Sequence, residues 1–157
     1  MTAKVWIVDD DSSIRWVLER TLGSEGFECE SFADGEALLS SLEMRSPDVI
    51  LSDIRMPGMN GLELMHAVSA ELPHTQGIFM SGYADFSYAR EAIRQEALAY
   101  LLKPVDPGEL AEALRKQGSL QQELVKAQQR RELQVLRAPI DGVVQQLAVT
   151  TVGACSL

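Results

Sequence analysis

The sequence predicts an α/β domain built on one doubly wound, five-stranded parallel sheet. Short, continuous apolar runs alternate along the chain with segments whose apolar residues recur every three or four positions. Five such pairs within about 117 residues suit a single sheet. The runs at 5–8, 49–51 and 100–102 lack polar alternation, as expected of strands covered by helices on both faces. The expected strands are 5–8, 27–32, 49–51, 78–80 and 100–102.

The expected helices follow these strands in turn, near 12–24, 35–45, 61–72, 84–96 and 107–117. The first is predicted to bury one apolar stripe, made of Ile14, Val17, Leu18 and Leu22. The last opens with Asp106-Pro107-Gly108-Glu109, which is typical of an N-cap, a proline at the first helical position and a glutamate that closes a capping box. We detect no internal repeat.

Composition limits the class of protein. The 157 residues are 46% hydrophobic and 24% charged, which fits a soluble globular protein and excludes disordered and fibrous classes. There is no apolar run of about 20 residues and no signal-peptide pattern, so we expect a cytoplasmic protein without membrane association. The net charge of -9 argues against nonspecific nucleic-acid binding. Cys29 and Cys155 are too few and too far apart for a disulfide framework, and we expect free thiols.

Charge divides the chain into two regions. Residues 1–117 hold 10 basic and 20 acidic side chains, whereas residues 118–157 hold 4 and 3. We therefore predict a domain over 1–117 and an extension over 118–157. The extension suggests a helix over 120–136, a break at 138–142 and a short β-like run over 143–152. Disorder of the whole extension is an equally good interpretation.

Acidic residues follow two of the predicted strands. Asp9, Asp10 and Asp11 come directly after the first strand, and Asp53 follows the third. The carboxyl ends of parallel strands form the edge where such sheets bind ligands. If the first and third strands are neighbours, the crowded carboxylates need a cation or a proton, and Mg²⁺ with a phosphoryl ligand fits them. The alternative is that these acids only cap the helix beginning near Ser12, and we expect one of them to do so.

Two further residues reach the same edge. Lys103 lies between the fifth apolar run and Pro104, and Ser81 ends the fourth run. A solvated lysine and an ordinary turn serine are the simpler interpretations. Taken together with the carboxylates, however, these residues supply a nucleophile, a metal site, a cation and a hydroxyl.

Three segments carry a family resemblance: VWIVDDDSSIRWVLER, LSDIRMPGMNGLELM and AYLLKPVDPGEL. Residues 4–117 resemble the receiver domain of two-component response regulators. The first two segments are similar to nitrogen-regulation (NtrC-type) receivers, and residues 81–114 resemble receivers attached to AraC-type output domains. The resemblance implies a flavodoxin-like sheet with strand order 2-1-3-4-5.

The resemblance also implies roles for the site residues. Asp53 would be the phosphoacceptor, modified by a sensor histidine kinase. Mg²⁺ would be held by Asp10 directly, by Asp9 through water, by Asp53 and by the backbone carbonyl of Arg55. Lys103 would pair with a phosphoryl oxygen.

Further implied residues concern switching. Ser81 would hydrogen-bond to the phosphoryl group, and Tyr100 matches the aromatic residue that rotates in response, although a core tyrosine is the simpler interpretation. The face formed by residues 84–117 would then contact a downstream protein or a second copy, with Phe86, Tyr88 and Tyr100 as candidate contacts. Catalysis would be limited to the domain's own phosphorylation and dephosphorylation.

The sequence departs from the family pattern at several positions. Glu96 occupies the end of a helix where glycine is usual, at a cost of roughly 1 kcal/mol or a different helix ending. Gly77 replaces a branched residue and is predicted to weaken the fourth strand. Side chains at the positions of Arg55 and Tyr83 influence water access to the acyl phosphate in this family, and a bulky Tyr83 suggests slow self-hydrolysis.

The extension and the rival functions complete the sequence predictions. Residues 119–153 resemble part of a haemolysin-type secretion adaptor, a membrane fusion protein, with an incomplete half-lipoyl domain. Without a G-x-x-x-x-G-K-[ST] loop we expect no ATPase domain and no direct DNA binding. One alternative function is a fusion or truncated product with a passive receiver. Another is an aspartyl-nucleophile phosphatase, although Arg55 stands where such enzymes place a second acid.

Overall fold

The computed structural model of the chain describes residues 3–82 and 86–145. It divides into two units, Met1–Gly118 and Ser119–Leu157. Within the described residues, no helix has both the length and the apolar character needed to cross a membrane.

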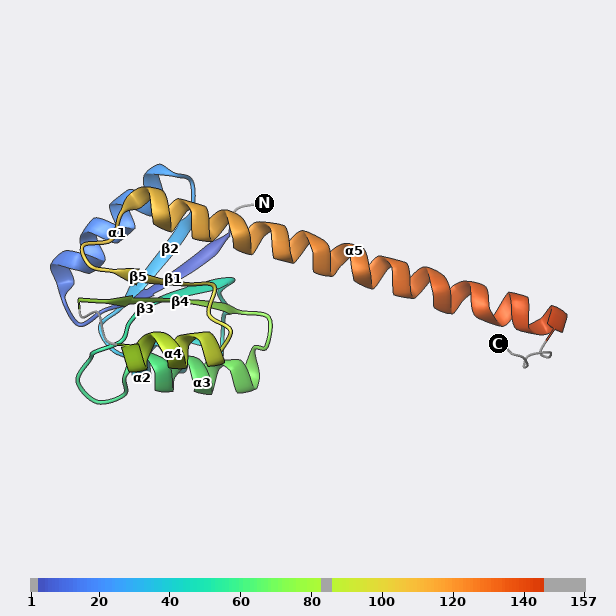
Figure 1. The fold of residues 1–157 in the computed structure, drawn as a ribbon, viewed down its shortest axis with the longest axis horizontal. Coiled ribbons are helices and arrows are strands. Elements are labelled where there is room, and N and C mark those ends of the chain that lie inside the picture. The colour runs from blue at the N-terminus through green and yellow to red at the C-terminus, as the bar shows by residue number, and fades with distance from the viewer. Residues whose placement is uncertain (1–2, 83–85, 146–157) are drawn as a thin grey trace. The chain divides into compact units, whose positions relative to one another are not determined.

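The first unit contains one parallel sheet of five strands, as the sequence predicts (Figure 1). The strands are β1 (Lys4–Val8), β2 (Glu28–Phe32), β3 (Val49–Asp53), β4 (Gln76–Ser81) and β5 (Ala99–Leu102). Their order is β2-β1-β3-β4-β5, which confirms the doubly wound topology. The central pairing sets Val5 opposite Val49 and Val8 opposite Ser52. β1 and β3 are therefore neighbours, and their carboxyl ends lie at one edge.

Helices cover both faces of this sheet. They are α1 (Ser12–Ser24), α2 (Gly35–Ser41), α3 (Gly61–Glu71), α4 (Phe86–Arg94) and α5 (Pro107–Gln145). α1 and the beginning of α5 lie on one face, and α2, α3 and α4 lie on the other (Figure 1). The N-cap predicted at Asp106 is confirmed, because its carboxylate accepts a hydrogen bond from the Gly108 amide at 3.1 Å.

The apolar core has two layers, one on each face of the sheet. In β1, Val5 and Ile7 pack with α1 and α5, while Trp6 and Val8 pack with residues of α2 and α3. All four side chains are at most 4% exposed. Strands buried on both faces have no polar face, which explains why these runs are continuously apolar.

Two details of the predicted helices are wrong. Val17 was expected in the buried stripe of α1 but is 53% exposed, while Leu18 and Leu22 are buried and Ile14 is partly buried. The helix turns by 100° per residue, so a stripe through Leu18 and Leu22 carries Val17 outward. α2 ends at Ser41 instead of near residue 45, because the amides of Leu42 and Met44 each bond to the carbonyl three residues earlier, those of Leu39 and Ser41, in tightened turns that do not continue the α-helix.

The predicted ends of the last helix are also wrong. α5 runs without interruption through Gly118 and the segment 138–142 to Gln145. The residues after Gly118 are mainly Gln, Glu, Leu, Lys and Arg, whose helix propensity favours continuation. The predicted β-like run is helical at 143–145, and its remainder, together with Cys155, lies outside the described residues.

Both departures noted in the second half of the domain have structural consequences. Glu96 adopts a left-handed φ of 57°, so the helix-ending conformation is retained without glycine. Gly77 lies in β4, which remains six residues long. A Cβ on Gly77 would lie 2.9 Å from the Cε atom of Met65, so the absence of a side chain there makes room for Met65 in the core.

Candidate functional site

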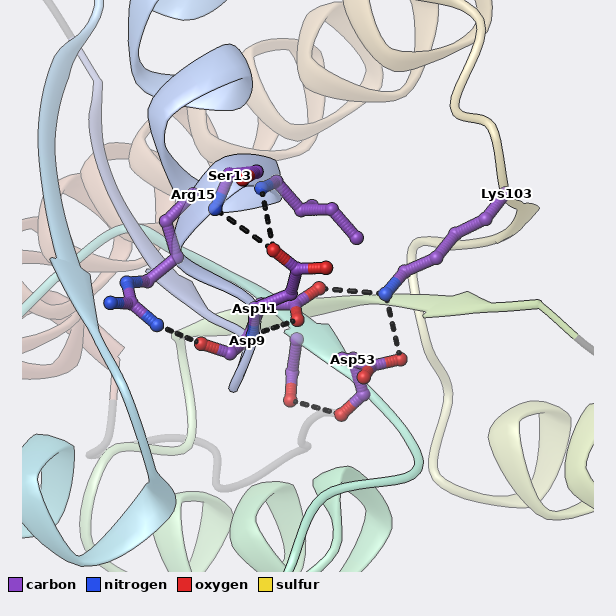
Figure 2. Close-up of polar contacts among 8 residues, drawn as sticks. Asp9, Asp11, Ser13, Arg15, Asp53 and Lys103 are labelled. Atoms are coloured by element: carbon purple, nitrogen blue, oxygen red, sulfur yellow. Dashed lines mark hydrogen bonds and ion pairs between the residues drawn. The ribbon is translucent and has the colours of Figure 1, made fainter.

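Four strand ends meet at the carboxyl edge of the sheet. Asp9 follows β1, Asp53 ends β3, Ser81 ends β4 and Lys103 follows β5. The amide of Lys103 donates to the carbonyl of Ser81 at 2.8 Å, so the pairing of β4 and β5 continues into the site. β3 is the central strand, so Asp53 ends the strand between those that lead to Asp9 and to Ser81. Figure 2 shows Asp53 beside Asp9 and Lys103. The predicted convergence of these residues is confirmed.

Asp9 is fully buried, and each of its carboxylate oxygens has a partner. Oδ1 accepts a hydrogen bond from the Asp11 amide at 2.9 Å, and Oδ2 accepts one from the Lys103 ammonium at 2.7 Å. The backbone carbonyl of Asp9 accepts a third from Nη1 of Arg15, at 2.6 Å (Figure 2). Asp9 is therefore held in place by Asp11 and Arg15, which follow it closely in the chain, and by Lys103, which follows the edge strand β5.

Asp11 has the capping role expected for one of the three acids. Its carboxylate accepts hydrogen bonds from the amides of Ser13 and Ile14, at 2.9 and 3.4 Å, and so satisfies free amides at the start of α1. This bonding leaves Asp9 and Asp10 as the acids directed to the site.

Lys103 links the two buried carboxylates. Its ammonium lies 2.7 Å from Asp9 Oδ2 and 3.3 Å from Asp53 Oδ1 (Figure 2). Burial alone would lower the pKa of Lys103, but the hydrogen bond to Asp9 and the attraction of Asp53 outweigh it, so the pKa is raised above 10.5. Lys103 is therefore a permanent cation in this site, and the interpretation of a solvated lysine is wrong.

The surroundings of Asp53 disfavour its ionised form. Burial and the nearby charge of Asp9 raise the pKa of this carboxyl above its ordinary value of 3.8, and Lys103 offsets them only in part. An acid whose ionised form is insufficiently compensated is a candidate for binding a cation or accepting a group.

Asp9, Asp10 and Asp53 form a set of potential metal ligands. One carboxylate oxygen from each lies within 4.8 Å of the others, and Asp10 is exposed to solvent. A set made only of hard carboxylate oxygens, with solvent on one side, suits a small divalent cation that retains water ligands. The residues present therefore fit a metal of the Mg²⁺ type.

Two residues that position the site were not recognised in the sequence. Arg15 holds the carbonyl of Asp9, and its only signal is its place one turn after Asp11 in α1. Gly61 begins α3, where a Cβ would lie 2.4 Å from the carbonyl oxygen of Asp53 and 2.8 Å from Oγ of Ser52. Only glycine lets α3 approach β3 this closely, and a glycine at the first position of the predicted helix was the available signal.

The other predicted residues surround this centre. Ser81 is 1% exposed at the end of β4, and Tyr100 is half-buried and packs against the core layer shared with α3. Arg55 lies on the loop after β3, and its side chain contacts Tyr88 of α4. Tyr83 lies outside the described residues, as does the side chain of Phe86.

The model of the response regulator receiver domain matches residues 5–115, which is most of the chain. This chain belongs to that family. Solved receivers have the same fold: a CheY-like receiver from Methanospirillum hungatei aligns with a TM-score of 0.73 and 31% identity, covering 78% of this chain and 99% of that one. CheY4 of Vibrio cholerae aligns with a TM-score of 0.68 and 33% identity over 74% of this chain and 98% of that chain.

Relatives by sequence include the DNA-binding transcriptional regulator NtrC. The Escherichia coli protein is 49% identical over 102 residues, or 65% of this chain, and the Klebsiella pneumoniae protein is 50% identical over 101 residues, or 64%. The receiver spans 22% of the length of either relative. The similarity to NtrC confirms the NtrC-type character of the N-terminal segments, and the family places this receiver in two-component signalling.

Proposed function

We propose that this receiver accepts a phosphoryl group on Asp53, with Mg²⁺ as cofactor and a sensor histidine kinase as donor. One observation carries the proposal: the Asp53 carboxylate lies within ion-pair distance of Lys103 and beside Asp9 and Asp10. A nucleophilic carboxylate and a phosphate are both anions, so they approach each other only where cations lie beside them and offset their repulsion. The site supplies one cation and a set of ligands for another.

The chemistry requires few protein groups. An oxygen of Asp53 attacks phosphorus, the new O–P bond forms as the N–P bond of a phosphohistidine breaks, and the imidazole leaves with the bonding electrons and takes up a proton. Lys103 is placed to pair with a phosphoryl oxygen without changing its own protonation. When bound, Mg²⁺ would neutralise carboxylate charge and accept a phosphoryl oxygen.

Different ligand roles for Asp9 and Asp10 agree with their surroundings. Both oxygens of Asp9 already accept hydrogen bonds, from the Asp11 amide and from Lys103. Asp10 is exposed and adjoins the opening of the site. We therefore propose direct coordination by Asp10, Asp53 and the backbone carbonyl of Arg55, with Asp9 acting through water. Substitution Asp10→Ala should weaken Mg²⁺ binding more than Asp9→Asn, as followed by tryptophan fluorescence, and equal affinities would contradict this assignment.

Switching would involve Ser81, Tyr100 and the face formed by residues 84–117. Ser81 is buried beside Lys103, and Tyr100 lies on the adjoining strand. On the outward side, Ile93 of α4 is 75% exposed and Leu102 at the end of β5 is 50% exposed. These exposed apolar side chains support a contact face for a downstream protein or a second copy.

The experiment that tests the function is phosphorylation by acetyl phosphate with Mg²⁺, followed by intact-mass measurement. The wild-type protein should gain about 80 Da, the mass of one phosphoryl group, and Asp53→Asn should not. Asp34→Asn is the matched control, because Asp34 caps α2 and asparagine is an equally good N-cap. Labelling of the Asp53→Asn protein would refute the assignment. Rapid, continuous consumption of acetyl phosphate would instead support the phosphatase alternative.

The role of the extension forms a further part of the proposal. We propose that 1–117 is the functional domain and that 118–157, whose likeness to a secretion adaptor rests on the sequence alone, is a passenger. The similarity of residues 81–114 to receivers of AraC-type regulators and a cytoplasmic location likewise rest on sequence reasoning. A chain ending at Gln117 should be phosphorylated at the full-length rate, whereas a clear difference in rate would assign the extension a regulatory role.

A further inference from the structure

A cavity of about 250 Å³ lies between α3, the start of β4 and the turn after α4. It is at the edge of the sheet where β4 begins, whereas Ser81 ends the same strand at the edge that holds Asp53. Gly77 lines the cavity, and the four residues of extended strand from Gly77 to Ser81 span about 13 Å. The cavity is therefore separate from the phosphoacceptor site.

The two departures from the family pattern in this half of the domain, Gly77 and Glu96, both line the cavity. The amide of Leu98 donates to the carbonyl of Gly77 at 2.8 Å, so the turn that carries Glu96 is fixed to the start of β4. Glu96 holds a left-handed φ of 57°. Residues other than glycine that are held in this conformation gather at functional sites, where the strain is retained for function. The position of Glu96 therefore directs attention to this cavity.

The polar groups of the cavity whose hydrogen bonds the structure defines are acceptors. The Thr75 hydroxyl donates to the Pro47 carbonyl at 2.9 Å, which leaves its oxygen able to accept. Nε2 of Gln95 donates to the Leu62 carbonyl at 3.2 Å. Oε1 of Gln95 is shielded from solvent and has no hydrogen-bond donor within the described part of the chain, and a buried acceptor without a donor is destabilising. Glu96 adds an exposed carboxylate.

Charge and apolar surface define the ligand further. Among residues 3–82 and 86–145, no lysine, arginine or histidine lines the cavity, so the charge of Glu96 meets no opposite charge in this lining. Met65 and Phe79, each at most 4% exposed, supply apolar surface. A matching ligand therefore combines an apolar stem with a cation that donates hydrogen bonds. A guanidinium is such a group, because it has five N–H donors, no acceptor and a planar fork that pairs with a carboxylate.

We infer that this cavity binds a guanidinium group on an aliphatic stem, with Glu96 pairing with the charge and Oε1 of Gln95 accepting one N–H group. Gln95 as a whole is only partly buried, so a small shift of its side chain brings this oxygen to the ligand. The guanidinium comes either from an arginine of a partner protein or from a free small molecule of the same chemistry. The bound ligand would join α3 to the turn after α4, and its binding does not depend on phosphorylation of Asp53.

The test follows the backbone amide chemical shifts of Gly77 and Ala97 in ¹⁵N-labelled, unphosphorylated full-length protein. The probes are n-butylguanidinium, its neutral isostere n-butylurea, and n-butylammonium. n-Butylguanidinium should give saturable shifts with a Kd on the order of 1 mM, as expected of a ligand with so few atoms. n-Butylurea lacks the charge and should bind about tenfold more weakly. n-Butylammonium lacks the planar fork and should also bind more weakly.

Variants of the lining test the assigned contacts. Glu96→Gln should weaken the binding of n-butylguanidinium about fivefold, since it removes one exposed, charge-assisted contact. Glu96→Gly should weaken it as well while relieving the left-handed φ, so that a lost ligand is not the result of unfolding. Ser69→Leu, at an exposed position of α3, should weaken binding by narrowing the cavity. Glu43→Gln removes an exposed carboxylate outside the cavity and should bind as the wild type does.

Acetyl-arginine amide distinguishes the two sources of the ligand. Tighter binding than that of n-butylguanidinium supports the site and assigns it to an arginine of a partner protein, whereas weaker binding supports the site and assigns it to a free small molecule. Shifts at Gly77 and Ala97 that do not saturate, equal affinities for n-butylguanidinium and either of the other two butyl probes, or an unchanged Kd in Glu96→Gln would overturn the inference. Failure of phosphorylation would overturn only the proposed function.

Discussion

Neutralising the phosphoacceptor should stabilise the protein when no metal is bound. In Asp53→Asn the side chain keeps its shape but loses its charge, in a site where burial and Asp9 raise the pKa of the carboxyl. Oxygens of Asp9 and Asp10 lie within 4.8 Å of an oxygen of Asp53, which at an effective dielectric constant of about 20 gives a repulsion of about 3.5 kcal/mol per pair. The attraction of Lys103 at 3.3 Å is about 5 kcal/mol on the same scale.

The repulsions outweigh the attraction by about 2 kcal/mol. Because Asp10 is exposed and its repulsion is screened by solvent, we expect Asp53→Asn to raise the free energy of unfolding by about 1 to 2 kcal/mol. The pH dependence has a definite sign. A raised native pKa means that the folded state holds the Asp53 proton more tightly than the unfolded state does, so the wild type loses stability as pH rises from 3.8 through the raised pKa. The variant lacks this loss.

Urea unfolding followed by the fluorescence of the buried Trp6 measures the effect. It should be run at pH 7 with EDTA and with Mg²⁺, and again near pH 4. The advantage of Asp53→Asn should shrink at pH 4 and in Mg²⁺, and Glu43→Gln, which neutralises an exposed carboxylate, serves as control. A variant less stable than the wild type in EDTA at pH 7, or an advantage independent of pH, would refute the electrostatic reasoning.

Three other substitutions test the ion pairs of the site and the backbone conformations in the domain around it. Lys103→Met should lower the free energy of unfolding by about 2 to 4 kcal/mol, since it leaves the buried Asp9 without its cation, and adding Asp9→Asn should restore part of the loss in urea unfolding. Glu96→Gly should raise it by roughly 0.5 to 1 kcal/mol by relieving a left-handed φ, seen as a higher melting temperature, and an unchanged or lower value would contradict this. Gly61→Ala should cost about 2 to 3 kcal/mol and slow phosphorylation, because its Cβ meets the carbonyl at the end of β3. Gly108→Ala, whose Cβ has its nearest neighbours at 3.6 Å, is the matched control, and equal effects of the two would argue against this reasoning.

Local patterns in the sequence determined the fold class and the residues at the centre of the site. Continuous apolar runs mark strands buried on both faces, so the five strands could be located from residues such as Val5 and Val49. Strand order followed only from the family resemblance, because periodicity does not say which strands pair. Once β1 and β3 are neighbours, the chain positions of Asp9 and Asp53 bring them together, and Lys103 follows from its place after β5.

Only the tertiary structure decided features that depend on side chains meeting across elements. Three such features are the hydrogen bond from Arg55 to Tyr88, the hydrogen bond from Arg15 to the Asp9 carbonyl, and the space that Gly77 leaves for Met65. Each depends on the direction and distance between side chains, which a linear pattern does not record. The exposure of Val17 within a predicted apolar stripe is decided in the same way. Local sequence fixes which conformation a segment prefers, whereas its contacts with the rest of the molecule decide where that segment ends and which of its side chains are buried.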